Sequence, residues 1–168
     1  MKKSVFIFLS TVVLLLGLVS FTSASPMEQI IKVNCNQAQS TLSRIEKTDS
    51  ALRINRGRAY NEITDLFYAM NARLASNKIS APNLASILDD YEKKLEDFRN
   101  DYNKYDDSLS DILNYKCQEK PFEFYTKLEK LRIKRHKLGE VVSDLDNLFS
   151  DYKKEFMSIK SQLKVEHE

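Results

Sequence analysis

Apolar residues recur every three or four positions along three long segments of this 168-residue chain, and this spacing limits the folds open to it. In the segment at about 82–116 the pattern has no exception, and its members are Leu84, Leu88, Tyr91, Leu95, Phe98, Tyr102, Tyr105, Leu109 and Ile112. An average spacing of about 3.5 residues is typical of helices that pack as in a coiled coil. The period of two that strands require is absent from these segments. The chain is therefore predicted to be all-α.

The other two segments follow the same period with polar interruptions. At about 121–165 the seam, meaning the line of residues that faces neighbouring helices, comprises Phe124, Leu128, Leu131, Arg135, Leu138, Val142, Leu145, Phe149, Tyr152, Phe156, Ile159 and Leu163. At about 27–77 we predict a less regular seam of Ile31, Cys35, Ala38, Leu42, Ile45, Asp49, Leu52, Arg56, Ala59, Ile63, Leu66 and Met70. On this interpretation Tyr60 and Phe67 flank the seam rather than belong to it.

Short breaks separate the three segments, and each break ends at a proline. Pro82 and Pro121 suit the first turn of a helix, where the missing backbone N–H group costs nothing. Short connections between long helices make consecutive helices antiparallel neighbours. We therefore predict an antiparallel, up-down-up three-helix bundle with coiled-coil-like heptad packing. Pairing of the segments between chains, and hence oligomerisation, is the alternative that the pattern leaves open.

Residues 1–24 have the three parts of a secretory signal peptide. Two lysines are followed by an apolar run from Val5 to Val19, and small residues precede a cleavage site after Ala24. We expect residues 25–168 to form a single helical-bundle domain exported to an extracellular, periplasmic or cell-surface location. The alternative is an uncleaved segment, which would be the protein's one attachment to a membrane.

Cys35 and Cys117 are the two cysteines of the chain, and an even pair in an exported protein indicates a disulfide bond. Folding the first helix back on the second brings Cys35 near the connection that contains Cys117. No further cysteine or histidine lies near either residue at ligand spacing, so we predict no metal site. The alternative is that the two cysteines are unrelated buried thiols. A redox-active pair is not expected, because its two cysteines would be close in sequence.

The charge balance argues against a nucleic-acid partner. The chain has 26 Lys and Arg residues against 24 Asp and Glu residues, and Lys2 and Lys3 account for the excess. Residues 25–168 are therefore neutral overall, whereas proteins that bind nucleic acid usually carry a clear basic excess.

Arg56 and Arg135 interrupt the seams of the first and third segments. Folding the helices back on one another places both near the level of Tyr102. The carboxylates closest to that level are Asp101 and Asp106, whereas Asp49 lies about two turns away and is a less favoured partner. We predict a polar layer that fixes helix register, formed by Arg56, Tyr102, Asp106 and Arg135.

The stretch KLEKLRIKRHKL, residues 127–138, is densely basic, and the first segment reads LRINRGR at a similar height. We therefore consider an anion-binding face on the side shared by the first and third helices, formed by Arg53, Arg58, Lys134 and Lys137. The alternative is that these side chains are the solvated surface of two helices.

The sequence contains no constellation that indicates catalysis. Loops are few, and no Gly-rich phosphate-binding loop is present. Adjacent acids such as Asp89 and Asp90 do not face one another on a helix. We therefore predict that the protein is not an enzyme and uses no cofactor.

We expect instead an exported, non-catalytic helical-bundle protein that acts through a protein or cell-envelope partner. The first alternative is an extracytoplasmic coiled-coil chaperone or holdase, which requires an exposed apolar groove. The second is a membrane-anchored envelope or secretion-system component, which requires an uncleaved N-terminal segment. An exposed aromatic patch, if present, is expected at the corner between the second and third helices, near Tyr115, Phe122 and Tyr125.

Overall fold

The computed structural model describes residues 25–165, and every regular element within them is an α-helix. The three helices are α2 (Pro26–Ser76), α3 (Pro82–Leu113) and α4 (Pro121–Val165). The predicted all-α class is therefore confirmed for this part of the chain. The predicted signal peptide, residues 1–24, lies outside the described residues.

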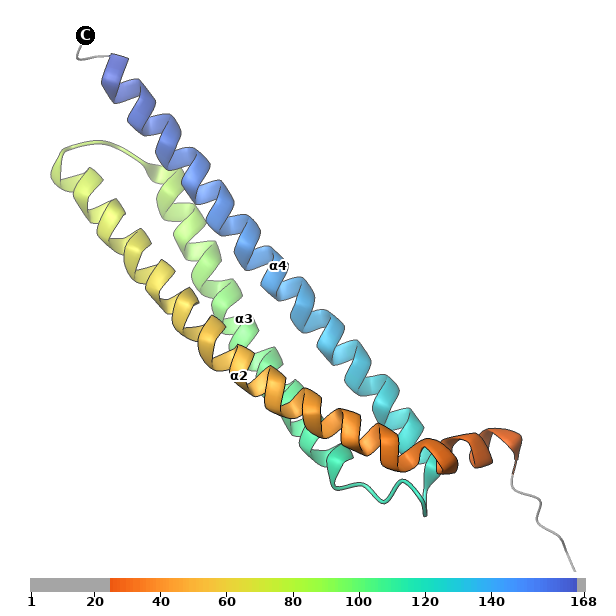
Figure 1. Ribbon diagram of the computed structural model, residues 1–168. Coiled ribbons are helices and arrows are strands. Elements are labelled where there is room, and N and C mark those ends of the chain that lie inside the picture. Colours follow the sequence, from red (N-terminus) through yellow and green to blue (C-terminus); the bar gives the residue numbers. More distant parts are fainter. Residues whose placement is uncertain (1–24, 166–168) are drawn as a thin grey trace, which may run out of the picture.

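The three helices lie side by side, and the chain reverses direction at the two connections, so that α2 and α4 both run antiparallel to α3 (Figure 1). Each helix begins at a proline, as the missing N–H group allows. At the start of α2 the Ser25 hydroxyl accepts a hydrogen bond from the backbone N–H of Glu28 at 3.2 Å. At its end the backbone N–H groups of Asn77 and Lys78 bond to carbonyl groups of the last turn.

Helix α3 forms the centre of the core. All of its predicted seam residues, from Leu84 to Ile112, are buried. Fully burying a side chain of this size stabilises the folded chain by about 1.5–3 kcal/mol. The contact between α3 and α4 is the most extensive of the three helix pairings, and the contact between α2 and α4 is the least extensive. Helices α2 and α4 are therefore held mainly through α3.

The buried side of α2 changes register at the middle of the helix. Its buried residues are Cys35, Leu42, Asp49, Tyr60, Phe67 and Leu74. Successive members are seven residues apart except at one step, where Tyr60 follows Asp49 by eleven residues. A step of eleven residues corresponds to about 3.67 residues per turn and interrupts heptad packing as an inserted four-residue stutter.

The prediction for the second half of the α2 seam is therefore only partly correct, since Ile63 and Met70 are half-buried and pack against the core. Tyr60 and Phe67 are buried core residues, whereas Ala59 and Leu66 are exposed. The prediction carried the spacing of three and four residues unchanged through Arg56. The shifted register is favoured because it buries two large aromatic rings in place of an alanine and a leucine.

Phe67 contacts both other helices through stacked and edge-on aromatic rings. Its ring lies parallel to that of Tyr152, with centroids 3.6 Å apart, and meets Tyr91 edge-on at 5.3 Å. The Tyr152 hydroxyl donates to the backbone carbonyl of Phe67 at 3.2 Å and to the side-chain oxygen of Asn71 at 2.7 Å. This cluster joins α2, α3 and α4 in the half of the molecule opposite the cysteines.

Exchanging neighbouring residues tests the shifted register. We expect Phe67→Ala to lower the free energy of unfolding by about 3–5 kcal/mol, because the ring leaves a cavity between three helices. Leu66→Ala should change it by less than about 1 kcal/mol, because Leu66 is half exposed. Urea denaturation followed by circular dichroism measures both values. Similar losses for the two variants would contradict the register.

Candidate functional site

Cys35 of α2 and Cys117 of the α3–α4 connection form the predicted disulfide bond, with Cα atoms 5.8 Å apart. Both residues are buried. The bond closes a separation of 82 residues, which in the chain-entropy description stabilises the fold by about 4–5 kcal/mol.

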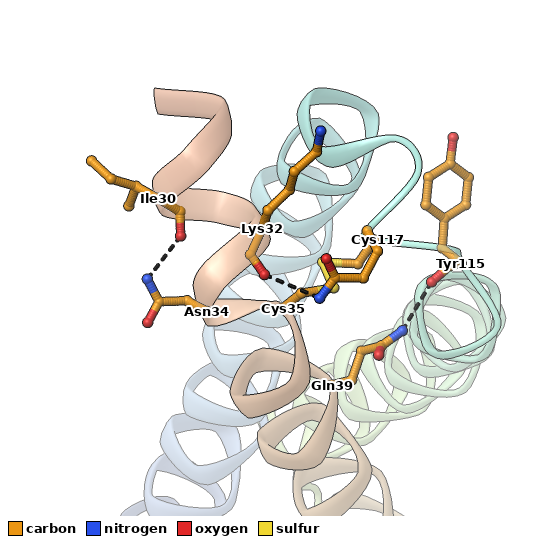
Figure 2. The surroundings of a disulfide bond; sticks show 8 residues. Ile30, Lys32, Asn34, Cys35, Gln39, Tyr115 and Cys117 are labelled. Carbon is orange, nitrogen blue, oxygen red and sulfur yellow. Dashed lines mark hydrogen bonds between the residues drawn. A yellow bond between two sulfur atoms is a disulfide. The ribbon is translucent and has the colours of Figure 1, made fainter. Parts of the chain in front are cut away.

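Two long-range hydrogen bonds accompany the disulfide. The side-chain amide of Gln39 donates to the backbone carbonyl of Tyr115 at 2.9 Å (Figure 2). The side-chain amide of Gln118 donates to the backbone carbonyl of Lys32 at 3.1 Å. Each bond joins the beginning of α2 to the corner between α3 and α4. The first part of α2 is therefore fixed to this corner by one covalent bond and two amide contacts.

A three-helix junction takes one residue from each helix: Asp49, Tyr105 and Arg135. The Tyr105 hydroxyl donates to Oδ2 of Asp49 at 2.6 Å. Nε and Nη2 of Arg135 donate to Oδ2 and Oδ1 of Asp49 at 3.0 and 3.1 Å. Asp49 is 8% exposed, so this bidentate contact compensates a buried carboxylate.

The junction also shifts the pKa values of Tyr105 and Arg135. Burial, followed by the hydrogen bond to Asp49, raises the pKa of the Tyr105 hydroxyl. The hydrogen bond to Asp49 raises the pKa of Arg135. Tyrosine is neutral and arginine positive at neutral pH even at their ordinary pKa values, and both shifts reinforce the states that the hydrogen bonds to the carboxylate require.

Polar contacts do form near the level of Tyr102, but they differ from the contacts of the predicted polar layer. Arg135 binds Asp49 rather than Asp106, and Tyr105 rather than Tyr102 reaches the pair. The prediction treated the helices as folded symmetrically about their connections, an assumption that is good only to about one turn. An arginine side chain can span a turn of about 5.4 Å, so the buried Asp49 becomes its partner.

Arg56 and Tyr102 lie beside the junction and form none of its hydrogen bonds. Both line a hollow between α2 and α4. Arg53 covers the Tyr102 ring, with its Cζ atom 4.7 Å from the ring centroid. It also donates to the side-chain oxygen of Asn103 at 3.1 Å. One face of the Tyr102 ring is therefore covered by a cation–π contact.

Two hollows lie between α2 and α4, on either side of the Asp49–Arg135 pair, and together we call them the α2–α4 groove. The first has a volume of about 320 Å³ and is lined by Asp49, Leu52, Arg53, Arg56, Phe98, Tyr102, Arg135, Leu138, Gly139 and Val142. The second has a volume of about 460 Å³ and is lined by Asn34, Gln37, Ala38, Thr41, Leu42, Ile45, Tyr105, Leu128, Leu131, Arg132 and Arg135.

The α2–α4 groove combines apolar walls with arginine side chains. Leu52 is 45% exposed, and the half-buried wall residues are Ala38, Ile45, Leu128, Leu138 and Val142. The first hollow opens within the register shift of α2, where no residue between Asp49 and Tyr60 is buried. Apart from Asp49, the charged residues that line the two hollows are all arginines.

The predicted anion-binding face does not form as one surface. Lys134 donates to the Ser108 hydroxyl and to the carbonyl of Lys104, and Lys137 pairs with Asp101 at 2.9 Å. Both lysines are therefore directed to α3, Lys137 to a carboxylate and Lys134 to a hydroxyl and a backbone carbonyl. Arg53 lines the α2–α4 groove, and Arg58 is exposed and lines neither hollow.

The predicted aromatic corner is partly exposed. Phe122 is 50% and Tyr125 38% exposed. The Tyr115 hydroxyl donates to Glu123, which raises the pKa of Tyr115 to about 12 and lowers the pKa of Glu123. The Lys127 ammonium lies 5.0 Å from the centre of the Tyr115 ring. Phe122 and Tyr125 are thus the accessible members of this group.

The α2–α4 groove was not predicted, because the heptad pattern assigns its wall residues to a closed seam. One signal in the sequence did point to it. Polar residues fall at three seam positions, Asp49, Arg56 and Arg135, and all three line the first hollow.

Among residues 25–165 no cluster of three or more metal-ligating side chains occurs. None of the three helices combines the length and apolar character needed to span a bilayer. Comparisons with protein-family models, curated proteins and solved structures find no match. The disulfide and the α2–α4 groove are therefore the features from which a function can be inferred.

A double-mutant cycle tests the three-helix junction. Arg135→Leu should lower the free energy of unfolding by about 2–3 kcal/mol, because it leaves the buried Asp49 carboxylate without its cation. Replacing Asp49 and Arg135 together by leucine should cost less than Arg135→Leu alone. Arg56→Leu is the control and should change stability by less than about 0.5 kcal/mol. Additive losses in urea denaturation would show that the pair does not act as a unit.

The Asp101 carboxylate is expected to stabilise the folded chain in a way that is lost in acid. Hydrogen bonds from Lys137 and Lys104 lower its pKa in the folded chain, against the effect of burial. This stabilisation is complete above the unfolded-state pKa of about 4 and is lost as pH falls through the folded-state value. Asp101→Asn should therefore reduce the loss of stability below about pH 4, measured by urea denaturation. Asp107→Asn, at an exposed position, is the control; equal effects of both variants would refute the assignment.

Proposed function

We propose that the protein is exported and acts by binding another macromolecule outside the cytoplasm, without catalysing a reaction. The observation that carries the binding role is the α2–α4 groove, in which seam residues such as Leu52 and Leu138 are left partly exposed. Exposed apolar surface of this kind, bordered by charged residues, is typical of an interaction site. The partner is a protein or a component of the cell envelope.

The disulfide supports the proposed location. Bonds such as Cys35–Cys117 persist in oxidising compartments and are rare where thiols are kept reduced. The apolar N-terminal segment of the sequence supplies the corresponding export signal, with cleavage after Ala24. Retention of this segment would instead make the protein an anchored component of the envelope.

We further propose that residues 25–168 form one antiparallel, up-down-up bundle with coiled-coil-like packing. The uninterrupted burial of the α3 seam supports this packing, as does the heptad spacing of Phe124, Leu131, Leu145 and Tyr152 in α4. The register shift in α2 is a local departure from it. A single domain follows from the disulfide, which joins α2 to the corner between the other two helices.

A chaperone or holdase is the second candidate function, and the same groove favours it, since such a protein needs an accessible apolar surface. The two functions differ in selectivity. A holdase binds many unfolded chains and prevents their aggregation, whereas an interaction protein binds a defined partner. Suppression of the heat-induced aggregation of an unrelated enzyme would support the holdase over the specific interaction.

The location can be tested in the native host with the full-length chain. We expect the protein in the extracytoplasmic fraction, with Ser25 at its N-terminus and with both cysteines resistant to alkylation until a reductant is added. The Cys35→Ser, Cys117→Ser variant controls for labelling of other groups. A cytoplasmic protein with alkylatable cysteines would overturn the proposal. An N-terminus at Met1 in the membrane fraction would support the anchored alternative.

A further inference from the structure

The α2–α4 groove has the periodicity of a helix-binding surface. Its partly exposed apolar residues lie at heptad positions of two helices that run parallel to each other, Ile45 and Leu52 on α2 and Leu138 on α4. Side chains with this spacing form ridges and holes that accept the side chains of a further helix. The α4 wall from Leu128 to Val142 is about 21 Å long, which matches roughly four helical turns.

Gly139 supports close approach of a partner at the first hollow. A Cβ atom at this position would meet no other atom of the chain within 4 Å, so packing inside the chain does not require a glycine. Its φ angle is negative, so the backbone does not require one either. Glycine destabilises the interior of a helix relative to alanine. The open space beside Gly139 admits side chains of a helix that packs across the groove.

The charge of the groove defines the chemistry of its occupant. Asp49 and Arg135 neutralise each other. Arg53 and Arg56 line the first hollow and form no ion pair with a carboxylate within residues 25–165. Arg132 lines the second hollow and bonds only to the partly exposed Glu129 of its own helix. A complementary partner therefore carries carboxylates opposite these arginines.

We propose that the α2–α4 groove binds an amphipathic helix of another protein, with an apolar stripe flanked by Asp or Glu residues. This inference rests on the proposed interaction function and specifies the class of partner. A second copy of the chain packed groove to groove would bring two arginine-rich grooves together, and like charges repel. A small ligand would fill one hollow, whereas the apolar wall extends past the junction into the other.

Site-specific photo-crosslinking in the native host tests this inference. p-Benzoylphenylalanine replaces Leu52 in the groove or, as a control, Ile54, which is 62% exposed and lines neither hollow. Crosslinked segments are identified by mass spectrometry. We expect the probe at position 52 to capture one segment of another protein, with apolar residues at three- and four-residue spacing and flanking acids. The probe at position 54 should not capture that segment.

Charge reversal supplies the second arm of the experiment. Arg53→Glu with Arg56→Glu should lower the yield of the crosslink from position 52 by about tenfold, since two ion pairs become repulsive. The matched control, Arg58→Glu with Arg73→Glu, changes the same charge on exposed residues of α2 outside the groove. The control should change the crosslink yield by less than about twofold. This is well below the tenfold change that corresponds to about 1.4 kcal/mol. Circular dichroism verifies folding, and Arg56→Glu alone replaces the double variant if Arg53→Glu disturbs the Tyr102 contact.

Each other outcome overturns the inference. Capture of a second copy, of lipid, or of many unrelated segments from position 52 would assign the groove to self-association, a membrane or a holdase. If both charge reversals lowered the yield of the crosslink from position 52 equally, the groove arginines would have no specific role in binding. If position 52 captures nothing while position 54 captures a defined partner, the inference fails and the proposed interaction function stands. If exposed positions on all three helices capture nothing, the proposed function fails as well.

Discussion

The uninterrupted apolar seam of α3 is the constraint on which the rest of the structure depends. Each of the other helices packs on it, α4 closely along its length and α2 in two registers separated by the step from Asp49 to Tyr60. Because α3 stabilises both partners, α2 and α4 need not fill the space between themselves. The α2–α4 groove follows from this division, and so does the position of the Asp49–Arg135 pair as a polar contact that crosses it.

Much of the fold could be predicted because the information is local in the sequence. Helix type, the prolines at helix starts, the α3 seam and the pairing of Cys35 with Cys117 follow from spacing and from short connections. The second half of the α2 seam could not be predicted in this way. A small change in helical phase decides whether Leu66 or Phe67 faces the core, and burial of the aromatic ring against Tyr91 and Tyr152 settles the choice.

The candidate site was predicted less completely, because it depends on offsets smaller than one turn. The sequence indicates that Arg135 lies among polar residues at mid-bundle, but the choice between Asp49 and Asp106 depends on the axial positions of two helices. The direction of Lys137 likewise depends on the rotation of α4, which turns this side chain to Asp101. The apolar residues of an incompletely covered seam give no signal in the sequence, since they occupy the same heptad positions whether or not a neighbour covers them; only the polar residues at seam positions do.

The disulfide also determines how the molecule would carry mechanical tension. A pull applied between the two ends of residues 25–165 passes along α2 to Cys35, crosses the covalent bond to Cys117, and continues along α4. Residues 36–116, which include most of α2 and all of α3, lie outside this path. A chain held by its N-terminal segment could therefore be stretched without direct load on the α3 seam. The mechanical element of the protein would then be α4, a single helix that is supported laterally by the part of the chain that bears no force.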